Sequence, residues 1–271
     1  MAYLRHLLFD GSYLYVVDSE SLNTPNSYGH LRQFGATSGS FVTTYENATT
    51  NFEDIYSVAK FNGDLLVTAS YVIPSGTVMQ GILKISAASG VYTYENPYPS
   101  SNSLYGLATD SNYLYIADQS AAAIIICTTA YSCSSITSTW VKPTGLAYDG
   151  SSYIYVTDYS PSVTKGLYKI NTSSRAVTSV SSSLFNQPNG VAVYSSTGDV
   201  YVVNTGTGDT DSSILKVTSA GVVSTFLDGS VTSNMLCKPI GAAISGSYLY
   251  ITNGICTTNS TYASSVIKIS L

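Results

Sequence analysis

Charged residues are scarce in this chain. Asp, Glu, Lys and Arg make up 10% of its 271 residues, whereas soluble domains usually contain roughly 25%. The net charge is −5 and Lys and Arg are not clustered, which excludes a nucleic-acid partner, because binding phosphates requires concentrated positive charge. No apolar run approaches the ~20 residues of a membrane-spanning helix, so we expect no membrane span. The opening MAYLRHLLFDG has no uninterrupted apolar core, and we expect a secretory leader to be absent or already removed.

Tyr, Ser, Thr, Asn and Gly take the place of charge. The chain has 24 tyrosines against 7 phenylalanines, which indicates aromatic mass kept partly in water, with hydroxyl groups bonded to solvent or backbone. Hydrophobic residues reach 44%, which excludes a disordered chain. So few titrating groups suit a protein packed against copies of itself, or one exposed to a harsh medium such as a thermophilic or acidic extracellular habitat.

The chain has four cysteines. Cys127 and Cys133 flank a short turn, and Cys237 and Cys256 are equidistant from the turn of a predicted hairpin. Residues opposite each other in a hairpin have about the separation that a disulfide needs, so we predict 127–133 and 237–256 disulfides. A zinc site is the alternative, but it would need CxxC-type spacing and more histidines. Disulfides favour an extracellular protein or one from a disulfide-rich hyperthermophile.

Three sequons agree with an extracellular or cell-surface location. They stand at Asn47, Asn171 and Asn259, which are possible glycosylation sites. A chain so rich in Ser and Thr produces such sequons by chance, so they add little to the argument.

One β-like phrase recurs through the chain. SYLYVVDS (12–19) returns as GDLLVTAS, NYLYIADQ, SYIYVTDY, GDVYVVNT and SYLYITNG, with anchors at Tyr15, Leu66, Tyr115, Tyr155, Tyr201 and Tyr250. The anchors are 40 to 51 residues apart, a period typical of stacked or radial repeats. Within each repeat the hydrophobic period is two, which predicts strands.

The first predicted strand of each repeat carries small residues at alternating positions. The pairs are Ser57/Ala59, Gly106/Ala108, Gly145/Ala147, Gly190/Ala192 and Gly241/Ala243, and the first repeat departs from them with His6 and Leu8. In a β-propeller the innermost strands converge on a central axis where only small side chains fit. A solenoid gives no such reason, so the pattern predicts a propeller with a local irregularity in its first blade.

We therefore predict an all-β fold, a six-bladed β-propeller of four-stranded antiparallel blades that forms one domain over residues 1–271. The predicted blades are approximately 1–50, 51–100, 101–140, 141–184, 185–234 and 235–271. The last blade has residues for three strands only, which leaves an exposed edge at 264–271. Such an edge is tolerated, or is filled by another chain, or marks a fragment of a longer polypeptide.

Three segments resemble NHL repeats: PTGLAYDGSSYIYVTD (143–158), QPNGVAVYSSTGDVYVVN (187–204) and YGLATDSNYLYIADQ (105–119). The resemblance covers the third to sixth repeats well, the first partly and the second weakly. It implies the fold but no single activity, because six-bladed relatives include hydrolases, lyases and binding scaffolds.

The mouth of the central channel is the candidate site, because the residue before each small residue is expected to point inward. These residues are Arg5, Tyr56, Tyr105, Thr144, Asn189 and Ile240. The resemblance implies that hydrolases hold a divalent ion there with a carboxylate and asparagines, and that lyases hold zinc with several histidines. One asparagine without an acid is too little for calcium, and two histidines are too few for zinc. We predict no catalytic residue, no cofactor and no metal, with His6 packed or lining the channel.

Other polar groups predict no chemistry. Asp209 and Asp211 resemble the start of a calcium loop whose later ligands are missing. Glu46, Glu53 and Glu95 are scattered, so they form no glycosidase pair, and no GxSxG motif is present. Trp140 is expected to pack between the third and fourth blades. The Asp or Asn that closes each phrase is expected to form an Asx turn; these are Asp18, Asp118, Asp158, Asn204 and Asn253, with Ala69 as the exception.

The long loops after the second strands are expected to share one face and to carry any recognition. They are 19–29, 70–80, 205–212 and 254–263. We expect a non-enzymatic extracellular propeller that serves in surface assembly or recognition, through self-association or another surface protein. One alternative is a metal-dependent hydrolase of the lactonase or strictosidine-synthase-like kind, with a metal near Asn189 helped by Asp158 or Asn204. The other is a glycan-binding module that stacks sugars on Tyr28, Tyr71 and Tyr159.

Overall fold

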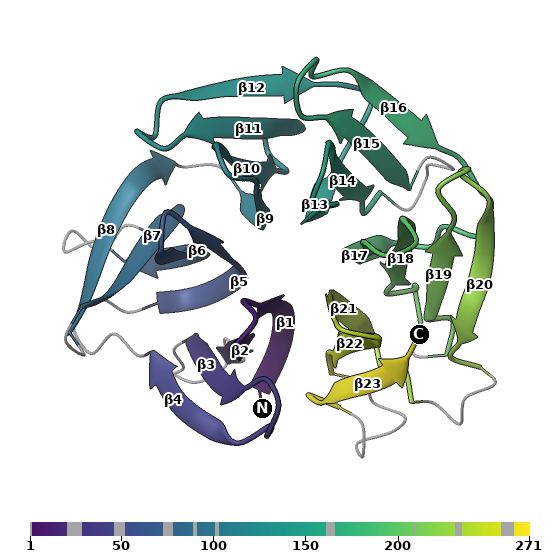
Figure 1. The fold of residues 1–271 in the computed structure, drawn as a ribbon, viewed down its shortest axis with the longest axis horizontal. Coiled ribbons are helices and arrows are strands. Elements are labelled where there is room, and N and C mark those ends of the chain that lie inside the picture. Colours follow the sequence, from purple (N-terminus) through teal and green to yellow (C-terminus); the bar gives the residue numbers. More distant parts are fainter. Residues whose placement is uncertain are drawn as a thin grey trace.

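The computed structural model is a ring of six antiparallel sheets around a central channel (Figure 1). The structure describes residues 2–20, 29–45, 52–72, 78–88, 91–100, 103–160, 166–208, 210–230, 235–255 and 263–271. Five sheets have four strands and the last has three. This confirms the predicted six-bladed propeller with a three-stranded final blade.

The strands follow one another along the chain from blade 1 to blade 6. Blades 1 to 3 contain β1 (Ala2–Phe9), β2 (Tyr13–Glu20), β3 (His30–Gly35), β4 (Phe41–Tyr45), β5 (Phe52–Phe61), β6 (Asp64–Val72), β7 (Val78–Ala88), β8 (Val91–Ser100), β9 (Leu104–Thr109), β10 (Tyr113–Asp118), β11 (Ala123–Thr128) and β12 (Cys133–Thr137). Blades 4 to 6 contain β13 (Pro143–Tyr148), β14 (Tyr153–Asp158), β15 (Leu167–Asn171), β16 (Val177–Val180), β17 (Pro188–Tyr194), β18 (Asp199–Asn204), β19 (Ser213–Val217), β20 (Val223–Asp228), β21 (Pro239–Ser245), β22 (Tyr248–Asn253) and β23 (Val266–Ser270).

The recurring phrase forms the second strand of every blade, and its two faces pack against two different neighbours. In β10, Tyr115 packs with Trp140 and the residues of blade 4. Leu114 and Ile116, which point the other way, pack with blade 2. Because successive strand residues alternate between faces, a strand between two blades must be apolar on both, which explains the nearly continuous hydrophobic phrase.

The first strands of the six blades contact one another in turn around the channel (Figure 1). Their glycines are required by the backbone of the neighbouring blade, whereas the alanines that follow line the channel. A Cβ on Gly145 would lie 2.1 Å from the carbonyl oxygen of Asn189 in the next blade, and one on Gly241 would lie 2.3 Å from that of Arg5. Glycine therefore allows adjacent first strands to touch.

Every first strand also shifts its register against the second strand beside the small residue. Blade 1 shares this shift, which lies between Leu4 and Leu7. The predicted irregularity of blade 1 is therefore wrong at the level of strand pairing: His6 replaces glycine without changing the pattern. A bulge of this kind re-aims the side chain next to it.

Threonines on the second strands of alternate blades bind the first strand of the following blade. Their hydroxyl groups donate to the backbone carbonyl of the following blade, in the pairs Thr68–Tyr105, Thr157–Asn189 and Thr252–Arg5. The last pair joins blade 6 to blade 1, and the rings of Phe9 and Tyr250 lie 4.7 Å apart across the same seam. The second strand of one blade thus contacts the first strand of the next, and this joins the ring.

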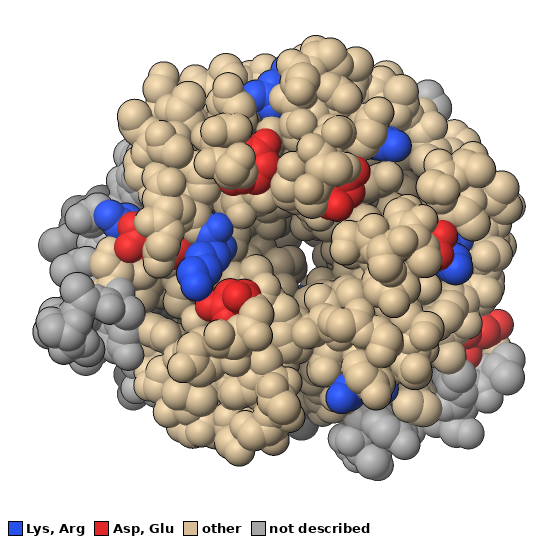
Figure 2. All heavy atoms as spheres, in the orientation of Figure 1, with Lys and Arg blue, Asp and Glu red and all other residues tan. Residues whose placement is uncertain are grey.

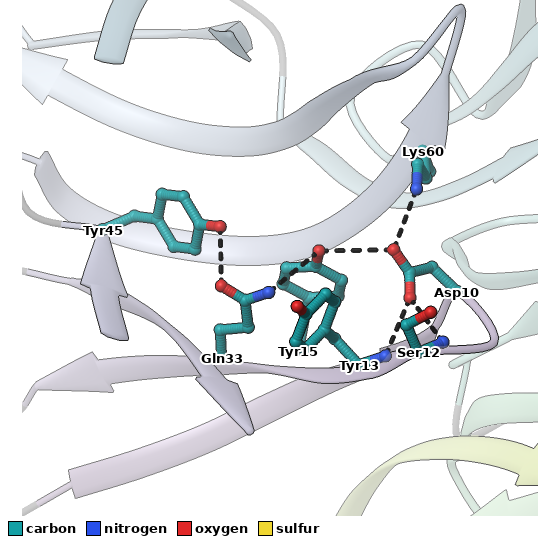
Figure 3. A network of polar contacts seen from close by, with 7 residues as sticks. All are labelled: Asp10, Ser12, Tyr13, Tyr15, Gln33, Tyr45 and Lys60. Atoms are coloured by element: carbon teal, nitrogen blue, oxygen red, sulfur yellow. Dashed lines mark hydrogen bonds and ion pairs between the residues drawn. The ribbon is translucent and has the colours of Figure 1, made fainter. Parts of the chain in front are cut away.

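A polar network connects blade 1 to blade 2 at the short-turn face (Figure 3). Tyr45 donates to Gln33 at 2.9 Å, Gln33 contacts the Tyr15 hydroxyl at 3.5 Å, and that hydroxyl donates to Asp10 at 3.3 Å. Lys60 of blade 2 binds the same Asp10 oxygen at 2.8 Å. Burial, followed by the nearby Asp10 charge, raises the pKa of Tyr15, so the network holds a neutral phenol and its role is structural.

Some of the few charged side chains in the described part of the chain form ion pairs. Figure 2 shows the charged side chains as separate groups around the open centre of the ring. Three of the ion pairs are Lys60–Asp10, Lys84–Asp64 and Lys216–Asp199. No helix in the described part of the chain is long and apolar enough to cross a membrane.

The predicted Cys127–Cys133 disulfide is present. It connects directly paired residues of β11 and β12. Cys237 is also disulfide-bonded, and Cys256, its predicted partner, lies outside the described residues.

Candidate functional site: the channel mouth

A cavity of about 460 Å³ opens at one end of the central channel. It is lined by all of the residues expected at the channel mouth, namely Arg5, Tyr56, Tyr105, Thr144, Asn189 and Ile240. Each stands beside the register shift of its first strand. The repeated bulge thus turns one side chain per blade toward the cavity.

A second row of residues, which the sequence reasoning missed, lies next to the first. Lys142, Gln187 and Lys238 line the cavity from blades 4, 5 and 6. Each precedes a proline, in the segments KPTG, QPNG and KPIG. This recurrence was the signal available in the sequence, but strand periodicity does not show which way a residue before proline points.

The backbone fixes this second row by a repeated hydrogen bond. In each of these blades, the residue that follows the second strand donates its N–H to the backbone carbonyl of the second-row residue. The pairs are Tyr159–Lys142 at 2.9 Å, Thr205–Gln187 at 3.1 Å and Gly254–Lys238 at 3.1 Å. Gln187 and Lys238 adopt positive φ angles of 52° and 45°, a conformation that non-glycine residues rarely adopt. The loops that carry this second row therefore have a defined backbone conformation, and they form one wall of the cavity.

Side chains of adjacent blades connect this wall. Gln119 of blade 3 donates to the Thr144 hydroxyl at 2.9 Å, and Tyr159 of blade 4 donates to the Gln187 amide oxygen at 2.8 Å. Thr205 of blade 5 donates to the carbonyl of Pro239 at 2.8 Å. Hydrogen bonds that run from one blade to the next hold the polar lining in place before any ligand arrives.

The opposite wall is aromatic and comes from blades 1 to 3. The rings of Tyr56 and Tyr105 lie 4.8 Å apart, and the Arg5 guanidinium lies 4.6 Å from the centre of the Tyr56 ring. Asp54 pairs with Arg5 at 3.5 Å and accepts a hydrogen bond from the Ser19 hydroxyl. Burial raises the pKa of Tyr56, so its phenol stays protonated and serves as a donor and a stacking surface.

His6 lines both this cavity and a second cavity of about 230 Å³ at the other end of the channel. Its Nδ1 atom is buried without a hydrogen-bond partner. Burial lowers the pKa of His6 to about 4, so the imidazole is neutral at pH 7 and adds no positive charge to the channel.

The described residues do not form the metal site of the hydrolase alternative, in which Asp158 or Asn204 would help Asn189 to hold a metal. Asp158 and Asn204 are buried and bond the loop that enters the first strand of their own blade. The Asp158 carboxylate accepts from the N–H groups of Val141 and Lys142 at 2.7 and 2.8 Å, and Asn204 accepts from that of Asn186. Neither lines the cavity with Asn189. Among the described residues, no three or more His, Cys, Asp or Glu side chains come together to hold a metal ion.

The expected Asx turns are therefore only part of what these residues do. Asp118 bonds the N–H of Ala121 in its own loop, and Asp158 also bonds that of Ser160. Asn253, like Asn204, reaches back to the entering loop, where it accepts from Cys237 and donates to the carbonyl of Met235. Asp18 instead pairs with Arg32 at 2.7 Å. The phrase ends in Asp or Asn because the folded blade buries two neighbouring loops that need polar partners.

Asp211 likewise accepts hydrogen bonds, most of them from residues of its own loop. It accepts hydrogen bonds from Thr207, Gly208 and Asn186. Although burial opposes ionisation, these donors lower the pKa of Asp211 to about 2. Its neighbour Asp209 lies outside the described residues.

Other candidate residues lie away from the cavity or outside the described part. Trp140 packs against Tyr168 with ring centres 5.4 Å apart and donates to the carbonyl of Ala122. Asn171 ends β15 and bonds the turn that follows it. The positions outside the described residues are Tyr28, Glu46, Asn47 and Asn259 and the side chains of Glu53, Tyr71 and Glu95.

The predicted loop 70–80 is largely strand. β6 continues to Val72 and β7 begins at Val78, and these two residues pair directly. Tyr71, Val72 and Val78 are residue types that favour strands, and they extend the ladder beyond the phrase. Of the other long loops, 205–208 and 210–212 lie at the cavity end, and much of 19–29 and 254–263 lies outside the described residues.

No family model matches the chain, and no curated protein matches it. Solved structures do. Virginiamycin B lyase from Staphylococcus aureus is 11% identical with a TM-score of 0.63, covering 99% of this chain and 95% of that one. The calcium-binding protein regucalcin from Agrobacterium tumefaciens is 13% identical with a TM-score of 0.70, covering 99% and 90%. An auxiliary nutrient binding protein from Bacteroides ovatus is 14% identical with a TM-score of 0.67, covering 92% and 67%.

These similarities establish the six-bladed propeller fold. The three proteins are named for a lyase, a calcium-binding protein and a nutrient-binding protein, so the fold alone does not select an activity.

Proposed function

We propose that the protein is a non-enzymatic extracellular propeller that assembles through its incomplete sixth blade, with a second copy of the chain adding a strand to β23. The observation that carries the proposal is the three-stranded sheet β21–β22–β23, beside five sheets with four strands. The Cys127–Cys133 disulfide is compatible with an extracellular location. The scarcity of charge suits a surface that packs against copies of itself.

The hydrogen-bond pattern identifies which groups of β23 face the open side. Leu271 donates its N–H to Ser247, and Asn253 donates to the carbonyl of Ser265. Bonded positions alternate in an antiparallel ladder, so the N–H and C=O groups of Val266, Lys268 and Ser270 point away from β22. The described strands leave this side of the sheet uncovered.

Two copies can pair antiparallel about a two-fold axis with a favourable register. Placing Lys268 opposite Ser270 of the second copy aligns Ile269 with its own equivalent and Ile267 with Leu271. This register avoids two facing lysines, which would repel each other. It continues the apolar face on which Ile267, Ile269 and Leu271 already pack, and it joins two blades into one sheet related by two-fold symmetry.

The test is Lys268→Pro compared with Lys268→Ala, measured by light scattering after size-exclusion chromatography. Proline removes only an N–H that points outward, so β22 keeps its partners while the added strand loses one. We expect the wild type and Lys268→Ala to be dimers and Lys268→Pro to be a monomer with unchanged circular dichroism. A monomeric wild type, or dimers in all three proteins, would overturn the proposal.

A further inference from the structure

The row of side chains around the channel mouth is bulky in blades 1 to 3 and changes to a small residue in blade 4. The Arg5 guanidinium lies 4.6 Å, and the centre of the Tyr105 ring 4.8 Å, from the centre of the Tyr56 ring. Tyr56 thus has a neighbour from each adjacent blade, whereas Tyr105 ends this stack. The next residue of the row is Thr144, its smallest side chain, which leaves room beside the Tyr105 ring in the cavity.

The part of the cavity formed by blades 3 to 5 has unused hydrogen-bonding groups. Its residues are Tyr105, Gln119, Thr144, Gln187 and Asn189. Gln119 donates its amide nitrogen to Thr144, and Gln187 accepts through its amide oxygen from the tyrosine of blade 4. Within the described part of the chain, these bonds leave Gln119 Oε1 and Gln187 Nε2 without a partner, together with the Asn189 side chain and the Tyr105 hydroxyl.

The same residues are held in position by other contacts. The Thr144 hydroxyl, which accepts from Gln119, donates to the carbonyl of Lys142 at 2.9 Å. The backbone carbonyl of Asn189 accepts from a threonine of blade 4. Tyr105 is half-buried and packs against the core between blades 3 and 4. Because these groups are fixed before binding, a ligand pays little of the entropy that ordering them would cost.

This combination of groups matches a neutral sugar ring. An amide side chain offers both a donor and an acceptor, and each hydroxyl group of a sugar does the same. A tyrosine ring offers a flat apolar face, which suits the C–H face of a pyranose. A carboxylate only accepts hydrogen bonds, so the oxygen of Gln119 would repel it. The cavity volume of about 460 Å³ lies in the range of small-molecule sites.

We infer that the channel mouth binds a neutral sugar in its pyranose form. The apolar face of the sugar lies on the Tyr105 ring, and its hydroxyl groups bond Gln119, Gln187 and Asn189. This site is separate from the β23 edge and does not depend on the assembly proposed there. It makes the propeller a carbohydrate-binding protein at one end of its channel.

Saturation-transfer NMR with the whole protein tests the inference. The ligands are the methyl glycosides of glucose, galactose and mannose, and the comparisons are mannitol and triglycine. Mannitol carries similar hydroxyl groups on an open chain that has no ring face, and triglycine carries amide groups instead. We expect at least one glycoside to bind about tenfold more tightly than mannitol, with the strongest saturation on its ring C–H protons. Because the ligand is neutral, its affinity should not change between low and high NaCl concentrations.

Variants of two residues locate the sugar. Asn189→Ala should weaken binding about tenfold and keep its circular dichroism, since this side chain has no partner in the described part of the chain. Tyr105→Phe keeps the ring and should weaken binding less than Tyr105→Ala. The control is Tyr13→Ala, which removes an exposed tyrosine at the short-turn face, away from the cavity (Figure 3), and should bind as the wild type does.

Four results would overturn the inference. They are binding of none of the glycosides, mannitol or triglycine binding as tightly as the best glycoside, affinity that falls as salt is added, and unchanged affinity in Asn189→Ala. Should Tyr105→Ala fail to fold, the Asn189 variant and the comparison with mannitol still decide the question.

Discussion

The hydroxyl of Thr252 donates to the carbonyl oxygen of Arg5 at 2.9 Å and joins residues 247 positions apart. The same hydroxyl accepts from the N–H of Gly241 at 2.7 Å. One fully buried side chain therefore satisfies two backbone groups at the seam between the last and first blades. Among the described strands, β1 pairs within blade 1 and not with blade 6, so this contact is part of what closes the ring.

Replacing Thr252 with valine should destabilise the protein by about 2 kcal/mol, since two buried backbone groups lose their partner while the side-chain volume is kept. The measurement is denaturant unfolding combined with hydrogen exchange. We expect faster exchange in β1 and β21. Thr157→Val is the matched control, because Thr157 bonds Gly145 and Asn189 in the same way inside the ring. It should cost a similar free energy and leave exchange in β1 unchanged; equal effects of both variants on β1 would argue against a special seam.

Adding a methyl group to Gly241 should cost at least about 2 kcal/mol of unfolding free energy, because the new Cβ meets a backbone oxygen that cannot move aside. The Cβ would lie 2.3 Å from the Arg5 carbonyl. Gly246→Ala is the comparison, since Gly246 has a φ of +57° and open space around it, so only backbone strain of about 1 kcal/mol is expected. Urea denaturation of the two variants checks the order; a smaller cost at Gly241 would contradict it.

Breaking the Cys127–Cys133 disulfide should lower stability by about 2 kcal/mol, as expected for closing so short a loop. Cys133→Ser removes this bond and leaves the rest of the chain unaltered. Thermal unfolding with and without reductant is the measurement, and the midpoint of the wild type should fall further on reduction than that of Cys133→Ser. An identical response would mean that the bond contributes nothing.

His6 should make the protein sensitive to mild acid. Its pKa falls from 6.5 to about 4 through burial, so the unfolded chain binds the proton more readily than the folded one. The stabilisation is complete above pH 6.5 and is lost as the pH falls toward 4. The imidazole is half-buried, and we expect about 1 to 2 kcal/mol over that window. Unfolding free energies at pH 7 and pH 4.5 check this, and His6→Gln should reduce the difference; an equally large difference in the variant would assign it to other groups.

Much of the fold was predictable because its signals are local. The phrase around Tyr15 repeats with strand periodicity, and a strand that is apolar on both faces must lie between two layers. The number of phrases predicts the number of blades. The number of strands in the repeat around Tyr250 predicts the three-stranded last sheet. The spacing of Cys127 and Cys133 likewise specifies a hairpin position whose partners face each other.

The candidate site was predictable only in part. The residue beside each small residue lines the cavity, as at Asn189 and Ile240, since the repeat marks equivalent positions. Lys142 and Lys238 were missed because their side chains converge only when the loops before two prolines are folded against the neighbouring blades. The hydrogen bonds of Asp158 to Val141 and Lys142 were missed for the same reason.

The sequence by itself determined the strands, the number of blades and the open last sheet, because hydrophobic period and repeat spacing act within a few tens of residues. Only the tertiary structure decided that Gly241 faces the Arg5 carbonyl, that Thr252 joins the two ends of the ring, and that the lysines gather at one channel mouth. Each of these depends on the angle at which successive blades pack, and that angle is set by contacts between segments far apart in the chain.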